Sequence, residues 1–341
     1  MAGAMDWRLA AAVCAAGGLG SVPCAMLSED QIEHAAAQIR AVTRRSFNLN
    51  FFCHETRVDS AAESAWRQRL APYYRELEIA SDAVATAARR EPFGEAACGL
   101  VERLRPRVVS FHFGLPDAHL VARVKLAGAV VLSSATTVEE AFDLERRGVD
   151  AVIAQGSEAG GHRGMFLTQD VSAQIGTMAL VPQIVDAVSV PVIAAGGIAD
   201  GRAIAAALAL GATAVQIGTA YLLSDEATIA APHRAALLQH ASDATVITNV
   251  MTGRPARGLA NRVMRELGPM SDAAPPFPTA ASPLAPLRAT AEAVGSGDFS
   301  PMWAGQAARL ARCGGAGNLT RAMWQDAQRV LATLRPPLTP T

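Results

Sequence analysis

The chain has 341 residues, of which 50% are hydrophobic and 18% charged, and its formal net charge is −1. This composition is typical of a globular protein with a large core, and the near-zero net charge argues against nucleic acid as a partner. The five cysteines show no metal-ligand spacing, so we expect free thiols, a cytoplasmic location and no metal site. No cleavable leader and no apolar run of membrane-spanning length is found, so we expect no membrane partner.

Short β-rich runs alternate with helix-like segments along most of the chain. The expected strands are residues 47–52, 107–114, 129–134, 150–156, 190–197 and 213–219. The expected helices between them are residues 28–42, 117–127, 137–147, 179–188 and 200–210. The strands are continuous apolar runs, as in a parallel sheet that is buried on both faces. This repeat predicts an α/β fold of the (β/α)8 TIM-barrel type, with a doubly wound sheet as the alternative.

Two segments interrupt this repeat. Residues 61–90 form a charged helical insertion. Residues 271–287 contain five prolines, so we expect neither regular helix nor strand there. We therefore divide the chain into a barrel domain over 1–245, which includes the insertion, and a substrate or cap region over 246–341 with C-terminal helices.

Polar and glycine residues lie at the ends of several of the expected strands or directly after them. Barrel enzymes build their sites at the carboxyl ends of the strands, so these residues are candidates for one site. They include Asn50, His112, the loop "AQGSEAGGHRG" over 154–164, Gly196-Gly197 and Gln216–Thr219. Bare backbone N–H groups at glycine turns can bind a phosphate, so the last two turns are a candidate phosphate site. The alternative is that Gly196-Gly197 only makes a tight turn.

The motifs of this chain resemble those of the nitronate monooxygenases, flavin-dependent barrel enzymes once called 2-nitropropane dioxygenases. The resemblance runs in family order over nearly the whole chain, and SFHFG and WAGQ are more particular to the bacterial class I group. The matching motifs are MAG (1–3), AGGLGSV (16–22), FNLNFF (47–52), SFHFG (110–114), AQGSEAGGHRG (154–164), PVIAAGGIADG (191–201), QIGTAYL (216–222), GRPARGLANR (253–262) and WAGQ (303–306).

What the resemblance implies first is an FMN cofactor. The family's contacts fall on Met1, Ala2, Gly3, Asn50, Gln155, Gly160, Gly161, Gly196, Gly197, Gln216, Ile217, Gly218 and Thr219. We expect Gly197, Gly218 and Thr219 to hold the phosphate through backbone N–H groups and a hydroxyl. We expect the amides of Asn50 and Gln155 to face the ribityl chain or the ring, where such donors tune flavin electronics.

The resemblance also makes His162 the catalytic histidine and His112 a second candidate. An imidazole is a suitable general base for the α-proton of a nitroalkane. A preformed nitronate needs no base, and His162 would then bind or polarise the nitro oxygens. His112 either hydrogen-bonds the same oxygens or holds its strand end. We expect Glu158 and Arg163 to form ion pairs that shape the loop.

Two features depart from the family pattern. Family members open with a strand of the type PIIQAPMAG, whereas this chain starts at Met1-Ala2-Gly3, so we expect the first barrel strand to be missing. Phe299 stands where several relatives carry tyrosine, so we expect a substrate-facing hydroxyl to be absent.

The expected reaction is oxidation of an alkyl nitronate, or of a nitroalkane, by O2 to a carbonyl compound and nitrite. One alternative is an NAD(P)H-dependent FMN reductase acting on a quinone or an enoyl thioester. Another is a flavin-binding protein without catalysis. The sequence does not determine the oligomeric state, and a homodimer is possible.

Overall fold

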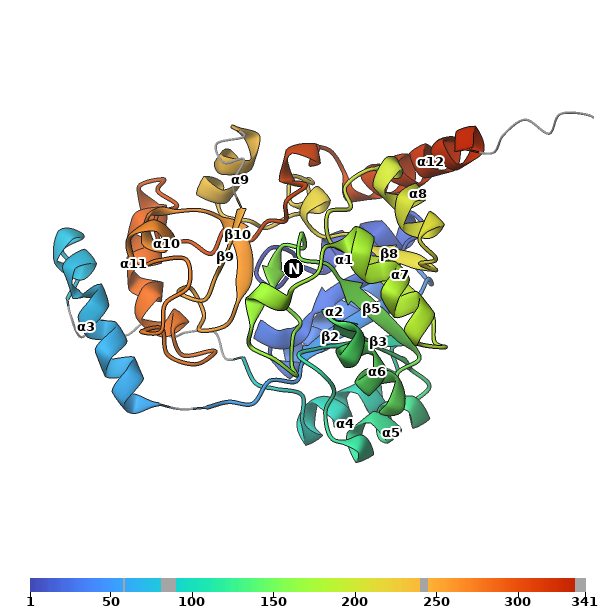
Figure 1. The fold of residues 1–341 in the computed structure, drawn as a ribbon, viewed down its shortest axis with the longest axis horizontal. Coiled ribbons are helices and arrows are strands. Elements are labelled where there is room, and N and C mark those ends of the chain that lie inside the picture. Colours follow the sequence, from blue (N-terminus) through green and yellow to red (C-terminus); the bar gives the residue numbers. More distant parts are fainter. Residues whose placement is uncertain (58, 81–89, 240–244, 335–341) are drawn as a thin grey trace, which may run out of the picture.

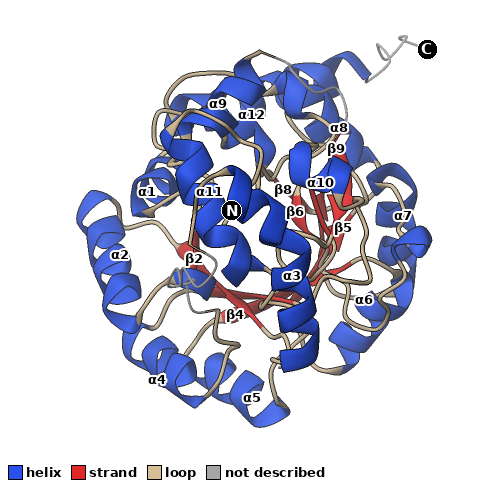
Figure 2. Ribbon diagram, turned by 90° about the vertical axis from the view of Figure 1, so that its left-hand side faces the viewer, coloured by secondary structure: helices blue, strands red, loops and turns tan. Residues whose placement is uncertain are grey.

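Seven parallel strands curl into one sheet, and helices cover its outer side (Figure 2). The computed structural model describes residues 1–57, 59–80, 90–239 and 245–334. The strands are β1 (Gly20–Pro23), β2 (Phe47–Phe52), β3 (Val108–His112), β4 (Val130–Ala135), β5 (Ala151–Gln155), β7 (Val192–Ala195) and β8 (Ala214–Gln216). Their order in space follows their order in the chain, whereas a doubly wound sheet reverses direction at a switch point. The predicted TIM-barrel fold is therefore confirmed.

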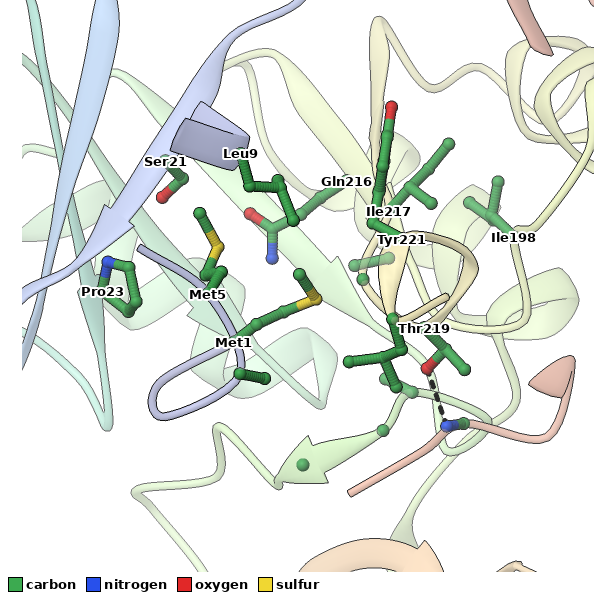
Figure 3. Close-up of a pocket in the computed structure, with 18 of the residues that line it drawn as sticks. Met1, Met5, Leu9, Ser21, Pro23, Ile198, Gln216, Ile217, Thr219 and Tyr221 are labelled. Atoms are coloured by element: carbon green, nitrogen blue, oxygen red, sulfur yellow. Dashed lines mark hydrogen bonds between the residues drawn. The ribbon is translucent and has the colours of Figure 1, made fainter. Parts of the chain in front are cut away.

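The two edges of this sheet are β1 and β8, and among the described residues they form no ladder with each other. Met1 and Met5 lie between them, with Ser21 and Pro23 of β1 on one side and Gln216 of β8 on the other (Figure 3). The sheet thus has the seven strands expected of a barrel without its usual first strand. β1 itself was not among the predicted strands.

The outer helices are packed between the sheet and solvent. They are α1 (Trp7–Ala15), α2 (Glu29–Val42), α4 (Glu95–Leu104), α5 (Ala118–Leu126), α6 (Val138–Arg146), α7 (Thr177–Ala187), α8 (Gly201–Ala209) and α12 (Ala316–Leu334). α12 packs closely on α8, because a Cβ on Gly201 would lie 2.3 Å from the backbone nitrogen of Ala327. The C-terminal helix thus covers the barrel, while the predicted domain boundary at residue 245 stays a prediction.

A further group of strands and α-helices forms a cap beside the barrel. They are a small antiparallel sheet of β6 (Gly161–His162), β10 (Ala256–Leu259) and β9 (Thr245–Thr248), with helices α3 (Ser60–Glu76), α9 (Ala231–Leu238), α10 (Arg262–Glu266) and α11 (Ala281–Ala293). α3 lies beside α11, away from the barrel (Figure 1). Trp66 donates to the carbonyl of Ala280 at 3.1 Å, and Tyr74 to that of Pro283 at 2.6 Å. The predicted helical insertion is therefore part of the cap, and its residues 81–89 lie outside the described residues.

The expectation of irregular structure over 271–287 is wrong from residue 281 onward, where α11 begins. Pro283 lies in the first turn of α11, where a backbone N–H would have no intrahelical partner. Only Pro286 lies deeper in the helix, and buried Leu284 and Leu287 pack in the cap core around it.

Candidate active site

One cavity of about 1040 Å³ extends from the gap between the edge strands β1 and β8, where α8 and α12 also line it, to the carboxyl ends of the strands. Its lining contains all fifteen residues that the sequence nominated for catalysis or cofactor binding. Their individual roles stay predictions, but the barrel does bring them together. The same cavity is lined by residues that sequence reasoning did not select, among them Ser21, Asn48, Arg90, Ser134 and Trp303.

His162 lies in a strand rather than in the predicted open loop. In β6 it pairs with Ala256 of β10, next to the pair of Gly161 and Arg257. Its carbonyl accepts two hydrogen bonds, from Nε2 of Gln155 at 3.1 Å and from Nε2 of His112 at 3.2 Å. The backbone that carries His162 is therefore fixed from both sides.

The imidazole of His162 lies among four aromatic rings. The ring centroids of Phe52, Phe113, Phe277 and Trp303 are 6.1, 5.9, 5.3 and 5.5 Å from that of His162. This burial lowers the pKa of His162 well below its usual value, and nearby cations lower it further. At neutral pH the imidazole is therefore uncharged, with one nitrogen as donor and the other as acceptor.

Thr252 contacts the ring of His162 and was missed by sequence reasoning. Its Oγ1 lies 2.9 Å from Nε2 of His162, and it can also donate to the carbonyl of Arg254 at 3.4 Å. Thr252 is buried, with 2% of its surface exposed. No local signal marks it, because ninety residues separate it from His162.

His112 has both ring nitrogens engaged. Since a carbonyl can only accept, Nε2 of His112 must carry the proton that it donates to His162. Nδ1 then accepts from the hydroxyl of Ser134 at 3.0 Å. Burial lowers the pKa of His112 to about 3, so the ring stays neutral. Of the two predicted alternatives, this geometry favours the one in which His112 holds local structure.

Gln155 links the loop to strand β5. Its Oε1 accepts from the backbone N–H of Gly164 at 2.7 Å, while its Nε2 bonds the carbonyl of His162. Gly160 closes the other side of the loop, because a Cβ there would lie 2.5 Å from the nitrogen of Gly305. Both residues thus hold the glycine loop, whatever else they contact.

The predicted ion pairs of Glu158 and Arg163 are wrong for the part of the chain that is described. Arg163 is fully buried and donates to the carbonyl of Gln155 and to Oε1 of Gln174, both at 2.9 Å. Both oxygens of Glu158 accept from the N–H of Thr177, at 2.8 and 2.9 Å, where α7 begins. A carboxylate at a helix start is favourable, so Glu158 ties the loop to α7. Both residues shape the loop, but through hydrogen bonds.

The glycine turns after β7 and β8, which are predicted to hold a phosphate, both line the cavity. Gly196 and Gly197 have φ angles of +115° and +69°, and a Cβ on Gly196 would lie 2.8 Å from Oγ1 of Thr177. Oγ1 of Thr219 accepts from the N–H of Gly305 at 2.9 Å, shown as the dashed line in Figure 3. The hydroxyl proton of Thr219 thus stays available as a donor toward a ligand.

Two asparagines of β2 point into the barrel, because residues two apart share one face of a strand. Nδ2 of Asn50 donates to Oγ of Ser110 at 2.8 Å. Nδ2 of Asn48 bonds Ser21 and Ser110 at 2.8 and 2.7 Å, while its buried Oδ1 has no partner among the described residues. A buried acceptor without a partner is costly, so Oδ1 of Asn48 fits a ligand that brings an N–H or O–H donor.

Phe299 does not face the cavity. Its ring is 1% exposed and packs edge to face on Tyr73 at 5.3 Å, inside the cap core. The expectation that its missing hydroxyl affects substrate contact is therefore wrong for this structure.

Within the described ranges no three side chains cluster as metal ligands, and no described helix is both long and apolar enough to cross a bilayer.

Comparison with known proteins gives the same family as the motifs. The nitronate monooxygenase family model matches residues 1–326. The chain is 41% identical over 342 residues to a nitronate monooxygenase of Paraburkholderia phytofirmans, covering 98% of this chain and 92% of that protein. It is 42% identical over 332 residues to one of Pseudomonas aeruginosa, covering 96% and 94%.

Solved structures agree with this match. The structure of nitroalkane oxidase from Streptomyces ansochromogenes superposes with a TM-score of 0.91 at 38% identity, covering 98% of this chain and 96% of that one. FabK from Thermotoga maritima superposes with a TM-score of 0.72 at 27% identity, covering 98% and 93%. The match of sequence, fold and cavity motifs over almost the whole chain shows that this chain belongs to the nitronate monooxygenase family.

Proposed function

We propose that this protein is an FMN-dependent enzyme that oxidises alkyl nitronates with O2 to carbonyl compounds and nitrite. One observation carries the proposal: a neutral imidazole, His162, is held rigidly in the wall of the cavity that the two glycine turns also line. Family membership supports the same reaction. All five cysteines are free thiols, which supports the proposed cytoplasmic location.

The donor set of the cavity fits FMN. The turns at Gly196-Gly197 and Gly218-Thr219 would hold the phosphate, since they offer backbone N–H groups and a hydroxyl proton. The unpartnered Oδ1 of Asn48 would accept a hydrogen bond from the ring or the ribityl chain. When bound, FMN would supply the redox chemistry of the reaction.

His162 has two tasks that depend on the form of the substrate. With a neutral nitroalkane, its unprotonated nitrogen would accept the α-proton, as a general base does. With a preformed nitronate no proton has to move, and the imidazole would contact the nitro oxygens. The depressed pKa of His162 keeps the ring unprotonated throughout the neutral pH range, so it is ready for either task.

One set of measurements tests the proposal. The purified protein should be yellow, and heat should release a cofactor that chromatographs as FMN. It should release nitrite from propionate 3-nitronate and should not consume NADH. NADH consumption without nitrite release would favour the FMN reductase alternative, and bound flavin with neither activity would favour the non-catalytic one. Release of FAD would contradict the cofactor assignment.

A further inference from the structure

Arg90 is held at the carboxyl end of the barrel by the residues that follow it. The backbone N–H of Phe93 donates to the carbonyl of Phe52, the last residue of β2, at 2.7 Å. The ring of Phe93 is buried and packs on Phe51 and Phe111, each with centroids 5.0 Å apart. The chain that carries Arg90 is therefore anchored on β2 and β3, beside the cavity.

The guanidinium of Arg90 and the imidazole of His162 contact the same aromatic ring. The Cζ of Arg90 is 5.7 Å from the ring centroid of Phe277, and His162 lies 5.3 Å from the same ring. Both side chains line the same cavity. Arg90 is also the second-largest cause, after burial, of the depressed pKa of His162.

Arg90 has no acidic partner among the residues that the structure describes, although it is half-buried. Arg288 and Arg321 also line the cavity. Arg288 is paired with Glu292 at 2.8 Å, and Arg321 on α12 donates to Oδ1 of Asn318 at 2.7 Å. A partly buried cation that only an aromatic ring contacts is poorly compensated, because desolvation disfavours the charged form. Burial accordingly lowers the pKa of Arg90. The guanidinium N–H groups of Arg90 are therefore free to donate hydrogen bonds to a ligand in the cavity.

We propose that Arg90 binds the nitronate oxygens of the substrate and sets the preference of the site for the anionic form over the neutral nitroalkane. This inference rests on the proposed function. A nitronate is planar, with its negative charge shared by two oxygens, and matches the guanidinium fork as a carboxylate does. His162 cannot supply this charge while it is neutral, so the anion needs another cation. Of the arginines that line the cavity in the described chain, Arg90 is the one that contacts the same aromatic ring as His162.

The experiment first measures anion binding without turnover. Isothermal calorimetry of the purified protein with sodium nitrate, a planar oxyanion, should give binding that Arg90→Gln weakens about 10- to 100-fold. Arg90→Lys should give an intermediate affinity, because it keeps the charge but loses the fork. Arg69→Gln is the matched control, since it removes the same charge from an exposed position on α3. This control should leave nitrate binding unchanged.

The second measurement compares substrates that carry no other charge. Arg90→Gln should raise KM for propane 2-nitronate about 10- to 100-fold and change KM for neutral 2-nitropropane much less. Equal changes for both substrates, or a change no larger than that of Arg69→Gln, would overturn the role of Arg90 and leave the proposed function intact. If Arg90→Gln loses flavin but keeps its nitrate affinity, Arg90 binds the cofactor, and its proposed role in binding the nitronate is overturned. Wild-type protein that binds nitrate through Arg90 but oxidises no nitronate would instead contradict the proposed function alone.

Discussion

His162 is the proposed general base, and its surroundings set its pKa. Four aromatic rings and the nearby cation disfavour the imidazolium, while Thr252 and the β6–β10 ladder fix the direction of the ring. A weak, uncharged base suits α-protons that nitro groups have already made acidic. The two tasks of His162 can be separated by substitution.

We expect His162→Asn to lower activity on neutral nitroalkanes by about 10²–10⁴-fold, the usual contribution of a general base. Asparagine keeps some hydrogen bonding but cannot accept the proton. Activity on preformed nitronates should fall much less, and FMN content should stay normal. Steady-state kinetics on both substrate forms of the same compound check this. Equal losses on both forms would point to binding or electrostatics rather than proton transfer.

Thr252 is expected to select the tautomer of His162. If its hydroxyl donates to the carbonyl of Arg254, then Nε2–H of His162 donates to Thr252 and the lone pair is on Nδ1. Thr252→Val should lower kcat on nitroalkanes about 10-fold with little change in KM. Thr252→Ser keeps the hydroxyl and should have a kcat close to that of the wild type. Nitrogen-15 NMR of the imidazole gives an independent reading. An unchanged tautomer in Thr252→Val would contradict this role.

The sequence allowed several residues of the cavity to be predicted, but not the residues that they contact across the fold. Asn50, Gln155 and the glycine turns could be selected because each lies near the end of a recognisable strand or directly after one. Thr252 and Arg90 could not, because their importance comes from contacts made across the fold with His162 and Phe277. Asn48 could have been predicted from the sequence, because it lies on the same strand face as Asn50.

At the level of elements, the predictable parts are those with a strong local pattern. Strand β2 was predicted with its observed ends, and α2 begins with a capping box between Ser28 and Gln31. The two-residue strand β6 has no pattern of its own and exists only because β10 pairs with it. The start of α11 was missed because prolines weigh against a helix, except in its first turn.

The turn after β7 can be tested with a matched pair of glycines. Gly196→Ala should weaken FMN binding at least about tenfold, because a side chain there needs a strained backbone and would collide with Thr177. Gly128→Ala has a similar positive φ of +92° but open space around the added carbon. It should cost only about 1 kcal/mol of unfolding free energy and leave FMN binding unchanged. Fluorescence titration with FMN distinguishes the two variants, and equal affinity would contradict the phosphate assignment.

At the level of the whole molecule, buried histidines make stability depend on pH. Burial lowers the pKa of His54 and of His233 to about 4. Between about pH 6.5 and 4, these two imidazoles are therefore protonated in the unfolded chain but stay neutral in the folded chain. The free energy of unfolding should be highest above pH 6.5 and fall toward pH 4, by up to about 1.4 kcal/mol per pH unit for each group.

Substitution identifies the contribution of one of these histidines. His54 is 4% exposed and packs against Phe277 with centroids 4.7 Å apart. His54→Leu should flatten the fall in stability between pH 6.5 and 4, while His34→Leu, at an exposed position of α2, should not. Urea unfolding at four pH values across this range measures both slopes. A slope unchanged by His54→Leu would show that the group is not protonated preferentially in the unfolded chain.

The cap has a consequence for synthesis of the chain on the ribosome. The buried face of α3 carries Trp66 and Leu70, both fully covered in the finished protein, and Trp66 reaches Ala280 across 214 residues of sequence. At about 5–20 residues per second, α3 is complete roughly 10–40 s before its partner helix has been made. During that interval its apolar face has nothing of its own to pack against. We therefore expect the nascent chain to be a substrate for chaperones while the barrel is already assembling beneath it.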